Sequence, residues 1–314
     1  MLTGMNYVYE VYKAGSFSKA AKNLFISQPA LSTAVSKVEK SLGNQIFNRS
    51  TTPLTLTETG SAYIEAVEKI MEAEYELQNR LLEINDMNYG HLNVGGASFF
   101  SQCMLPPIIK IFSETYPGIT LEMTESDSIA LYEDIQKKHI DLVLDAGICD
   151  DSQFTSHLLL TELILLAIPT SNPINEKYQE YQLTYSDILN GNHLPKQKCI
   201  SLKELENEKF ILLNKGHDMH NRSIRIFENN NMTPADVLYL NQLLTAYNFS
   251  AQGIGLAFVT DTVIKLASHQ DKLLYYKIND DLAHRNIFLA HRNSNTPTKA
   301  MNKFIEIARK VYTQ

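Results

Sequence analysis

The sequence has few cysteines, no long apolar run and no recognisable leader. Its three cysteines, Cys103, Cys149 and Cys199, are odd in number and far apart, so neither a disulfide framework nor a paired-thiol zinc site is indicated. The longest strictly apolar stretch, 163–168, is far shorter than the roughly 18 residues of a membrane span. Residues 1–13 lack the basic head and apolar core of a signal peptide. We therefore expect a cytoplasmic protein that makes no membrane contact and keeps its cysteines as reduced, structural thiols.

Signatures of catalysis are missing as well. Gly253-Ile254-Gly255 follows a predicted helix and precedes a predicted strand, which is the reverse of a dinucleotide-binding turn, and the third glycine is absent. The sequence has no phosphate-binding lysine loop, no zinc-binding helix motif and no serine nucleophile elbow. We expect a protein without catalytic residues, metal or cofactor.

Length and charge indicate a modular chain. At 314 residues, 44% of them hydrophobic and 20% charged, the chain suits about two soluble globular domains. Residues 1–60 have six lysines and arginines against three glutamates, whereas residues 61–90 have two against seven acidic residues. A basic head on an acidic body, within a net charge of −7, fits a DNA-binding module attached to another domain. A solvated surface would also explain a charge difference of this size, so the motifs must decide.

The head is predicted to contain three short helices, over 5–13, 17–24 and 28–42. Ser27 suits the N-cap of the third helix, Pro29 falls in its first turn, and Gly43 ends it. One face of this helix is an apolar stripe that needs a core, formed by Leu31, Val35, Val38 and Leu42. The opposite face has polar side chains that suit the edges of bases and phosphates: Gln28, Ser32, Thr33, Ser36, Lys37 and Lys40. Taken alone, the helix could equally be an ordinary surface helix.

The surrounding motif resembles the LysR-type transcriptional regulators. The matching residues are AGSFSKAAKNL at 14–24, ISQPALS at 26–32, VE at 38–39 and LG at 42–43, with FNR at 47–49 and LTETG at 56–60. The resemblance implies a winged helix-turn-helix on double-stranded DNA, with a wing in the hairpin near 49–56. The residues expected at DNA are Ser27, Gln28, Pro29, Ala30, Ser32, Thr33, Ser36 and Lys37 in the helix and Arg49, Thr51 and Thr52 in the wing.

The sequence departs from the family at Thr33, where an arginine is frequent, and at Thr51 and Thr52, where basic residues are frequent. Fewer cations release fewer counterions on binding. We therefore expect weaker DNA binding with a shallower salt dependence.

Residues 58–87 are predicted to form one long helix. A spacing of 4 and 3 residues places Tyr63, Val67, Ile70, Leu77, Leu81 and Ile84 on one seam, with Glu74 as a polar member. We expect this seam to pair two copies of the chain, as the resemblance also implies, in a homodimer and then a homotetramer formed as a dimer of dimers. The alternative is that the seam packs on the later domain of its own chain.

The rest of the chain alternates predicted strands and helices. Strands at 91–95, 119–125 and 140–145 alternate with helices at 104–116 and 129–138, and a second series follows from 160 to 259. This alternation predicts a parallel α/β sheet in two lobes, and the resemblance implies a two-lobed domain like periplasmic binding proteins. The expected division is a DNA-binding domain at 1–60, a linker and dimerisation helix at 61–90 and an effector-binding domain at 91–314. Lobe one takes about 91–162 and 269–314, and lobe two about 163–268. The segment 173–199 is longer than is usual for the family.

Ligands of such sheets bind beyond the carboxyl ends of the strands, where helix N-termini favour anions. The candidate effector-binding residues in these loops are Ser98, Phe99, Phe100, Ser128, His217 and Thr260. The serines could equally be helix caps and a phenylalanine could be core. The cluster His217, Asp218 and His220 suggests a polar rim in preference to a metal site, and Cys103 has no cationic neighbour in sequence that would make it a redox sensor.

The sequence thus predicts a transcription regulator controlled by a small-molecule effector, for which a negative charge is one option. The alternative is a small-molecule binding protein whose helix-turn-helix is not used on DNA.

Overall fold

The computed structural model describes residues 4–48, 54–84, 90–147, 149–193, 198–268, 270–293 and 297–312. The chain divides into two compact units, Met1–Leu81 and Leu82–Gln314, called here the head and the body. Of the described helices, none is both long enough and apolar enough to cross a membrane.

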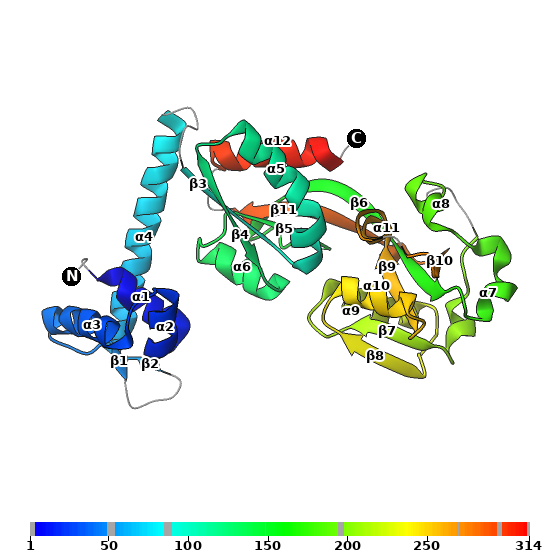
Figure 1. Cartoon of the computed structure of the whole chain (residues 1–314), viewed down its shortest axis with the longest axis horizontal. Coiled ribbons are helices and arrows are strands. Elements are labelled where there is room, and N and C mark those ends of the chain that lie inside the picture. The colour runs from blue at the N-terminus through cyan, green and yellow to red at the C-terminus, as the bar shows by residue number, and fades with distance from the viewer. Residues whose placement is uncertain are drawn as a thin grey trace. The chain divides into compact units, whose positions relative to one another are not determined.

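The head has three short helices, a small hairpin and a long helix (Figure 1). These elements are α1 (Met5–Ala14), α2 (Phe17–Asn23), α3 (Gln28–Leu42), β1 (Phe47–Asn48), β2 (Thr55–Leu56) and α4 (Glu58–Ile84). The Oγ of Ser27 accepts the backbone N–H of Ala30, and Gly43 ends α3 in the left-handed conformation. The helices therefore begin and end within a residue or two of the positions that capping chemistry predicts.

The core of the head forms under α3. Its apolar stripe, Leu31, Val35 and Val38, is buried with side chains from the other helices and from the hairpin. Glu39 is also buried, and its Oε1 accepts the backbone N–H of Ile46 at 2.9 Å. This bond ties α3 to the start of the hairpin, which fixes the exposed face of α3 relative to the wing.

The first part of the predicted pairing seam packs inside the head. Val67 is 1% exposed in the head core, where Ile64 is also buried and Tyr63 is half-buried. The prediction that Val67 faces a second copy is therefore wrong, because hydrophobic burial in its own domain already takes its surface. The half-buried Tyr63 keeps part of its surface, so its pairing stays a prediction. Ile70 is half-buried and Leu77 is 58% exposed, whereas the side chains of Leu81 and Ile84 lie outside the described residues.

The body contains one nine-stranded sheet in the order β4-β3-β5-β11-β6-β9-β7-β8, with β10 paired to β6. The strands of the first lobe are β3 (Gly90–Gly96), β4 (Ile119–Glu125), β5 (Leu142–Ala146) and β11 (His284–Arg292). Those of the second lobe are β7 (Lys209–Leu213), β8 (Asp236–Leu240), β9 (Leu256–Thr260) and β10 (Leu273–Lys277). The strand β6 (Phe154–Pro169) belongs to both, since its first half pairs with β11 and its second half with β9 and β10 (Figure 1).

The sheet is mixed: the strands that alternate with helices in each lobe are parallel, as expected, but β6, β10 and β11 are antiparallel to their neighbours. The pairs β3–β4, β3–β5, β7–β8 and β7–β9 are parallel, but β11 is antiparallel to β5 and to β6, and β6 is antiparallel to β9 and β10. Returning strands such as β11 come from distant sequence, which period-2 patterning cannot place. The pairing of β10 with β6 also puts residues 273–277 in lobe two, whereas we expected them in lobe one.

Helices cover both lobes. They are α5 (Leu105–Thr115), α6 (Ser128–Gln136), α9 (Asp218–Asn229), α10 (Leu243–Ala251), α11 (Asp261–Leu266) and α12 (Lys299–Tyr312). A π-helical turn, Phe100–Met104, precedes α5, and short 3-10 turns lie at Gln179–Tyr181, Leu202–Leu205 and Asp281–Ala283.

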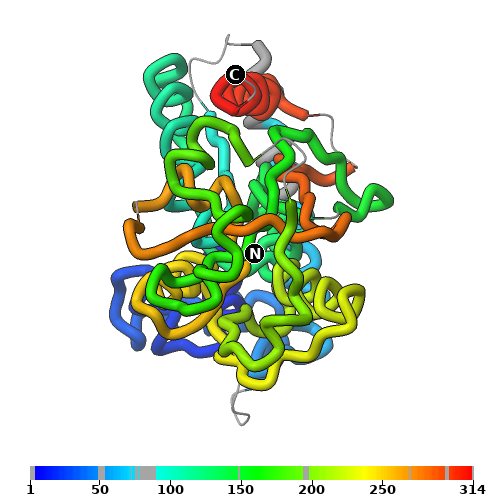
Figure 2. The backbone as a smooth tube through the Cα atoms, turned by 90° about the vertical axis from the view of Figure 1, so that its right-hand side faces the viewer, coloured from blue at the N-terminus to red at the C-terminus, as the bar shows by residue number. Residues whose placement is uncertain are grey.

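The long segment 173–199 packs onto lobe two. It includes α7 (Ile174–Lys177) and α8 (Tyr185–Leu189). An isolated β-bridge joins Leu183 to Tyr275 of β10, so the segment runs beside that strand (Figure 2). Just after the segment, a second bridge joins Ile200 to Ile278. His193 is fully buried, and its Nε2 lies 2.9 Å from Oδ2 of Asp261 at the start of α11. This segment is therefore part of the folded lobe and is held by a buried polar contact.

Candidate DNA interface and effector pocket

The polar face of α3 is open. Gln28, Pro29, Ala30, Ser36 and Lys37 are exposed, as is the capping Ser27, and Ser32 is half-buried. Short polar side chains at the N-terminal end of such a helix can reach base edges. The opposite face is packed in the head core, so this is the side of α3 that a ligand can contact.

Thr33 is exposed, but its hydroxyl donates to the carbonyl oxygen of Pro29 at 2.9 Å. This bond occupies the hydroxyl hydrogen and leaves the methyl group for outward contacts. Arg49, Thr51 and Thr52 lie outside the described residues, so their wing positions stay predictions.

Two exposed aromatic side chains next to α3 were not among the predicted DNA-binding residues. Tyr7 is 38% exposed and borders a shallow depression with Pro29, Ala30, Thr33 and Lys37. Phe25 is 96% exposed in the turn before α3, where its φ is 54°. The periodicity of α1 gave no signal for Tyr7, because that tyrosine reads as a core residue of an amphipathic helix.

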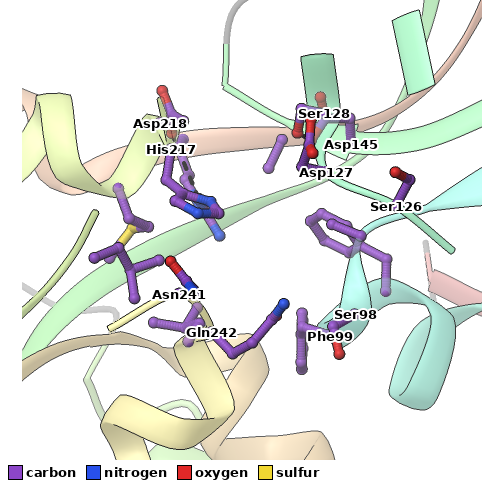
Figure 3. Close-up of a pocket in the computed structure, with 17 residues that line it drawn as sticks. Ser98, Phe99, Ser126, Asp127, Ser128, Asp145, His217, Asp218, Asn241 and Gln242 are labelled. Atoms are coloured by element: carbon purple, nitrogen blue, oxygen red, sulfur yellow. Dashed lines mark hydrogen bonds and ion pairs between the residues drawn. The ribbon is translucent and has the colours of Figure 1, made fainter. Parts of the chain in front are cut away.

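The body has a pocket, partly open to solvent, at the carboxyl ends of the strands (Figure 3). Its wall comes from the end of β5 and from the segments that follow β3, β4, β7 and β8, with Arg285 contributed by β11. Residues from both lobes therefore line one space, as expected for a ligand held between lobes.

Five of the six candidate effector residues lie on this wall: Ser98, Phe99, Phe100, Ser128 and His217. Thr260 does not line the pocket. It is fully buried as the N-cap of α11, where its Oγ1 accepts the backbone N–H of Val263. The Thr260 hydroxyl therefore caps α11 within the chain, so the prediction that Thr260 contacts the effector is wrong.

The charged residues of the pocket were not among the candidate effector residues, although Asp218 was expected on a polar rim. Asp145, at the end of β5, and Asp218, at the start of α9, line the wall together with Arg285, Asn241 and Gln242. Asp145 ends a predicted strand and Asp218 lies in the loop 215–220, so position relative to strand ends could have indicated both. Arg285 had no such signal, because its place depends on the return of β11 between β5 and β6.

A buried ion pair of lobe one meets a carboxylate of lobe two at the pocket. The guanidinium of Arg285, itself buried, pairs through Nε with Glu162 on β6 and lies 3.4 Å from Oδ2 of Asp218 through Nη1. Arg222 also donates to Asp218, at 2.8 Å. Glu162 Oε2 has no hydrogen-bond partner among the described residues, so Arg285 is the described side chain that compensates the charge of Glu162.

Asp145 has an unusual protonation equilibrium. Burial raises the pKa of its carboxyl to about 6, and Asp218 contributes to the rise, while the backbone of Ala146, the hydroxyl of Ser128 and the charge of Arg285 act in the opposite direction. Oδ1 of Asp145 accepts the Ser128 hydroxyl at 3.2 Å, which orients the carboxyl in the wall.

We expect Asp145→Asn to become more stable relative to the unchanged protein as pH rises. The raised pKa means that the folded state favours protonated Asp145, so its stabilisation is complete below the ordinary carboxyl pKa and is lost as pH rises through about 6. The amide never ionises, so the difference in free energy of unfolding should change by about 1–3 kcal/mol in its favour between pH 4 and pH 8. Denaturant unfolding of both proteins at several pH values measures this difference. A difference that does not vary with pH would show that Asp145 ionises as freely in the fold as in water.

His217, Asp218 and His220 do not converge. Nδ1 of the buried His220 lies 2.7 Å from the carbonyl oxygen of Leu213, away from Asp218, which pairs with arginines. Within the described ranges, no group of three His, Cys, Asp or Glu side chains is placed to hold a metal ion.

Two family models match the sequence, and together they cover nearly all of it. Residues 2–61 match the model described as "Bacterial regulatory helix-turn-helix protein, lysR family", and residues 85–313 match "LysR substrate binding domain". The chain belongs to the LysR family of transcriptional regulators. The pocket lies within the second matched segment and the open face of α3 within the first.

Relatives of known sequence agree with this assignment. The chain is 26% identical over 316 residues to the "Uncharacterized HTH-type transcriptional regulator YcgK" of Bacillus subtilis, covering 99% of this chain and 94% of that one. Over 161 residues it is 31% identical to the "HTH-type transcriptional regulator CrgA" of Neisseria meningitidis, covering 51% of this chain and 53% of that one.

Solved structures share the fold. A full-length OxyR from Pseudomonas aeruginosa matches with a TM-score of 0.66 at 19% identity, covering 98% of this chain and 94% of that one. Full-length CbnR, solved in complex with its target DNA, matches with a TM-score of 0.64 at 18% identity over 99% of each chain. This LysR-type regulator therefore combines a DNA-binding helix-turn-helix head with an α/β effector-binding body.

Proposed function

We propose that the regulator binds an operator through α3 and responds to a small molecule in the pocket between its lobes, without catalysing a reaction. The observation that carries the proposal is the open polar face of α3, whose other face is fully used by the head core. CbnR, a structural neighbour, was solved with DNA, and the effector-binding domain of BenM was solved with its effector benzoate.

We divide the chain by role into a DNA-binding domain at 1–60, a linker helix at 61–90 and an effector-binding domain from residue 91. Lobe one takes about 91–162 with β11 and α12, and lobe two takes about 163–268 with β10. The pairing of β10 with the second half of β6 supports this change to the lobe boundary.

We place the protein in the cytoplasm as a homo-oligomer, a dimer of dimers. The part of the seam that remains for pairing is Tyr63, Ile70, Leu77, Leu81 and Ile84, and the 58% exposed Leu77 supports a partner at the C-terminal end of α4.

Sedimentation across a concentration series should give dimers or tetramers that Leu77→Glu shifts toward monomers, because it puts a charge into an apolar seam. Lys69→Glu, at an exposed position of the same helix, is the control. A chain that stays monomeric when concentrated contradicts the seam.

We expect Gln28→Ala to lose discrimination between operator variants by about 1–3 kcal/mol, because its amide can bond a base edge in the major groove. Lys37→Ala should instead weaken all sequences alike and reduce the salt slope. Binding titrations with operator variants over a salt series measure both effects. If Gln28→Ala keeps the sequence preference unchanged, Gln28 does not read bases.

The proposal as a whole is tested by footprinting the purified chain on the DNA upstream of its own gene and of the divergent neighbour, over a salt series. Protection of an interrupted two-fold site that weakens with salt supports an operator-binding regulator. If no region is protected at low salt, the threonines at positions 33, 51 and 52, in place of basic residues, leave too few phosphate contacts for binding. That result would exclude an operator in this upstream DNA.

A further inference from the structure

The charged residues on the pocket wall are mostly acidic. Three carboxylates line it, Asp127, Asp145 and Asp218, and among the described lining residues the one arginine or lysine is Arg285. Figure 3 shows Asp127 and Asp145 on one side of the space and Asp218 on the other. Asp145 is 8% exposed, so water screens its charge poorly.

Arg285 is already neutralised by the chain. Its side chain is 6% exposed, pairs with the fully buried Glu162 and also lies close to Asp218. Beyond Asp218, Arg222 bonds the carbonyl oxygens of Leu282 and His284, at 3.0 and 3.1 Å. An anionic ligand would therefore have to compete with internal carboxylates for both guanidinium groups.

The chain also fills two of the helix N-termini that would attract an anion. Asp127 is the N-cap of α6, where its Oδ1 accepts the backbone N–H of Ala130 at 3.0 Å. Asp218 is the first residue of α9. Their negative charges complement the positive ends of these two helices, so the favourable places for a ligand anion are occupied.

A glycine lets Asp218 of lobe two pack against lobe one. Gly147 lies two residues after Asp145 and has φ +112°, and a Cβ at this position would come within 2.8 Å of Oδ1 of Asp218. Asp218 is thus packed against the turn that follows Asp145. Arg222 and Arg285 offset part of the charge of Asp218, yet Asp218 still raises the pKa of Asp145, so the two carboxylates repel each other across this poorly hydrated space. A cation placed between them relieves that repulsion.

We infer that the effector has a protonated amino or amidine group, which lies against Asp145 and Asp218, and an uncharged part that packs on Phe99, Met219 and Leu243. This inference rests on the pocket being the effector site, and it replaces the expectation of an anionic effector. The cation would bridge a carboxylate of each lobe, so its binding favours the arrangement in which the lobes meet.

The test uses probes that share a skeleton and differ in charge. Thermal shift and calorimetry on the full chain compare benzylamine with phenylacetate, butylamine with pentanoate, and 1,4-diaminobutane with adipate. We expect at least one amine to bind and to raise the melting temperature, and the carboxylate of the same skeleton to do neither.

Three variants locate the cation. Asp145→Asn keeps the shape of the wall and should weaken amine binding by about tenfold or more, as should Asp218→Asn, because each removes one partner of a poorly solvated charge pair. Asp151→Asn, at an exposed carboxyl outside the pocket, should leave the affinity unchanged.

Tighter binding of a carboxylate, equal binding of both members of every pair, no binding of any amine, or amine binding that survives both pocket variants would each overturn the inference. None of these results affects the footprint of the head on DNA, so failure of the ligand class is distinguishable from failure of the regulator function. Loss of the footprint with retained amine binding would instead show that the regulator function fails while the ligand class is right.

Discussion

Replacing Arg285 with methionine is expected to lower the free energy of unfolding by about 3–5 kcal/mol. The substitution removes the positive charge that compensates the fully buried Glu162 and leaves Asp218 with one guanidinium fewer. Glu162 cannot recover the loss by turning to another donor, because its Oε2 has no partner among the described residues. An ionised carboxylate left without a partner in a low-dielectric interior is one of the most destabilising changes a single substitution makes.

Guanidinium chloride unfolding of the full chain at pH 7 measures this effect. Lys209→Met is the matched control, because it breaks an ion pair with Asp236 at 3.1 Å whose side chains are 41% and 59% exposed. A surface pair of this kind contributes about 0–1 kcal/mol.

The double variant Arg285→Met with Glu162→Met separates charge from packing. If the unpaired carboxylate causes the loss, removing it as well should restore most of the stability. A double variant as unstable as the single one would show that the shape of the guanidinium, and not its charge, holds this junction of β6 and β11.

The second large effect is expected for Asp261→Ala, which should lower the free energy of unfolding by about 3 kcal/mol. Asp261 is 4% exposed and accepts the backbone N–H of Leu163, lies 2.9 Å from Nε2 of the buried His193, and pairs with Lys265. The alanine leaves a buried backbone donor and a buried imidazole without this acceptor. Since His193 fixes the segment 173–199 to α11, the same variant should also be cleaved faster by protease within that segment.

Chemical unfolding and limited proteolysis test this expectation, with Lys265→Ala as the control. Lys265 is the most exposed partner of Asp261, so its removal should cost less than about 1 kcal/mol and leave the protease pattern unchanged. If Asp261→Ala unfolds at the same denaturant concentration as the unchanged chain, the contact to His193 does not secure the segment.

The loss should also depend on pH. Burial alone would raise the pKa of Asp261, but hydrogen bonds from His193, Lys265 and the backbone of Leu163 outweigh it and lower the pKa. A lowered pKa stabilises the fold above the ordinary carboxyl range, and this contribution disappears as acid protonates the folded carboxyl. The difference in free energy of unfolding between Asp261→Ala and the unchanged chain should therefore be largest near neutral pH and become smaller as the pH falls.

The helices of the head follow from local sequence. Capping residues such as Ser27 and Gly43 act through bonds within one or two turns, so they fixed the ends of α3 before any tertiary contact was known. The spacing of Leu31, Val35 and Val38 fixed which face is buried and hence which face is open. The strands that follow the head were also recognisable, because β4 lies at the predicted residues and β3 and β5 lie within two residues of theirs.

The partners of those elements depend on contacts between residues far apart in sequence. A heptad pattern does not say what covers it, and Val67 turned out to serve the core of its own head. In the body, β11 returns antiparallel between β5 and β6 from more than a hundred residues away, and this pairing brings Arg285 to the pocket. Loops at strand ends indicated where the pocket lies, but its charge depends on contacts between Arg285, Glu162 and Asp218, which are far apart in sequence and meet because the strands pair in this order.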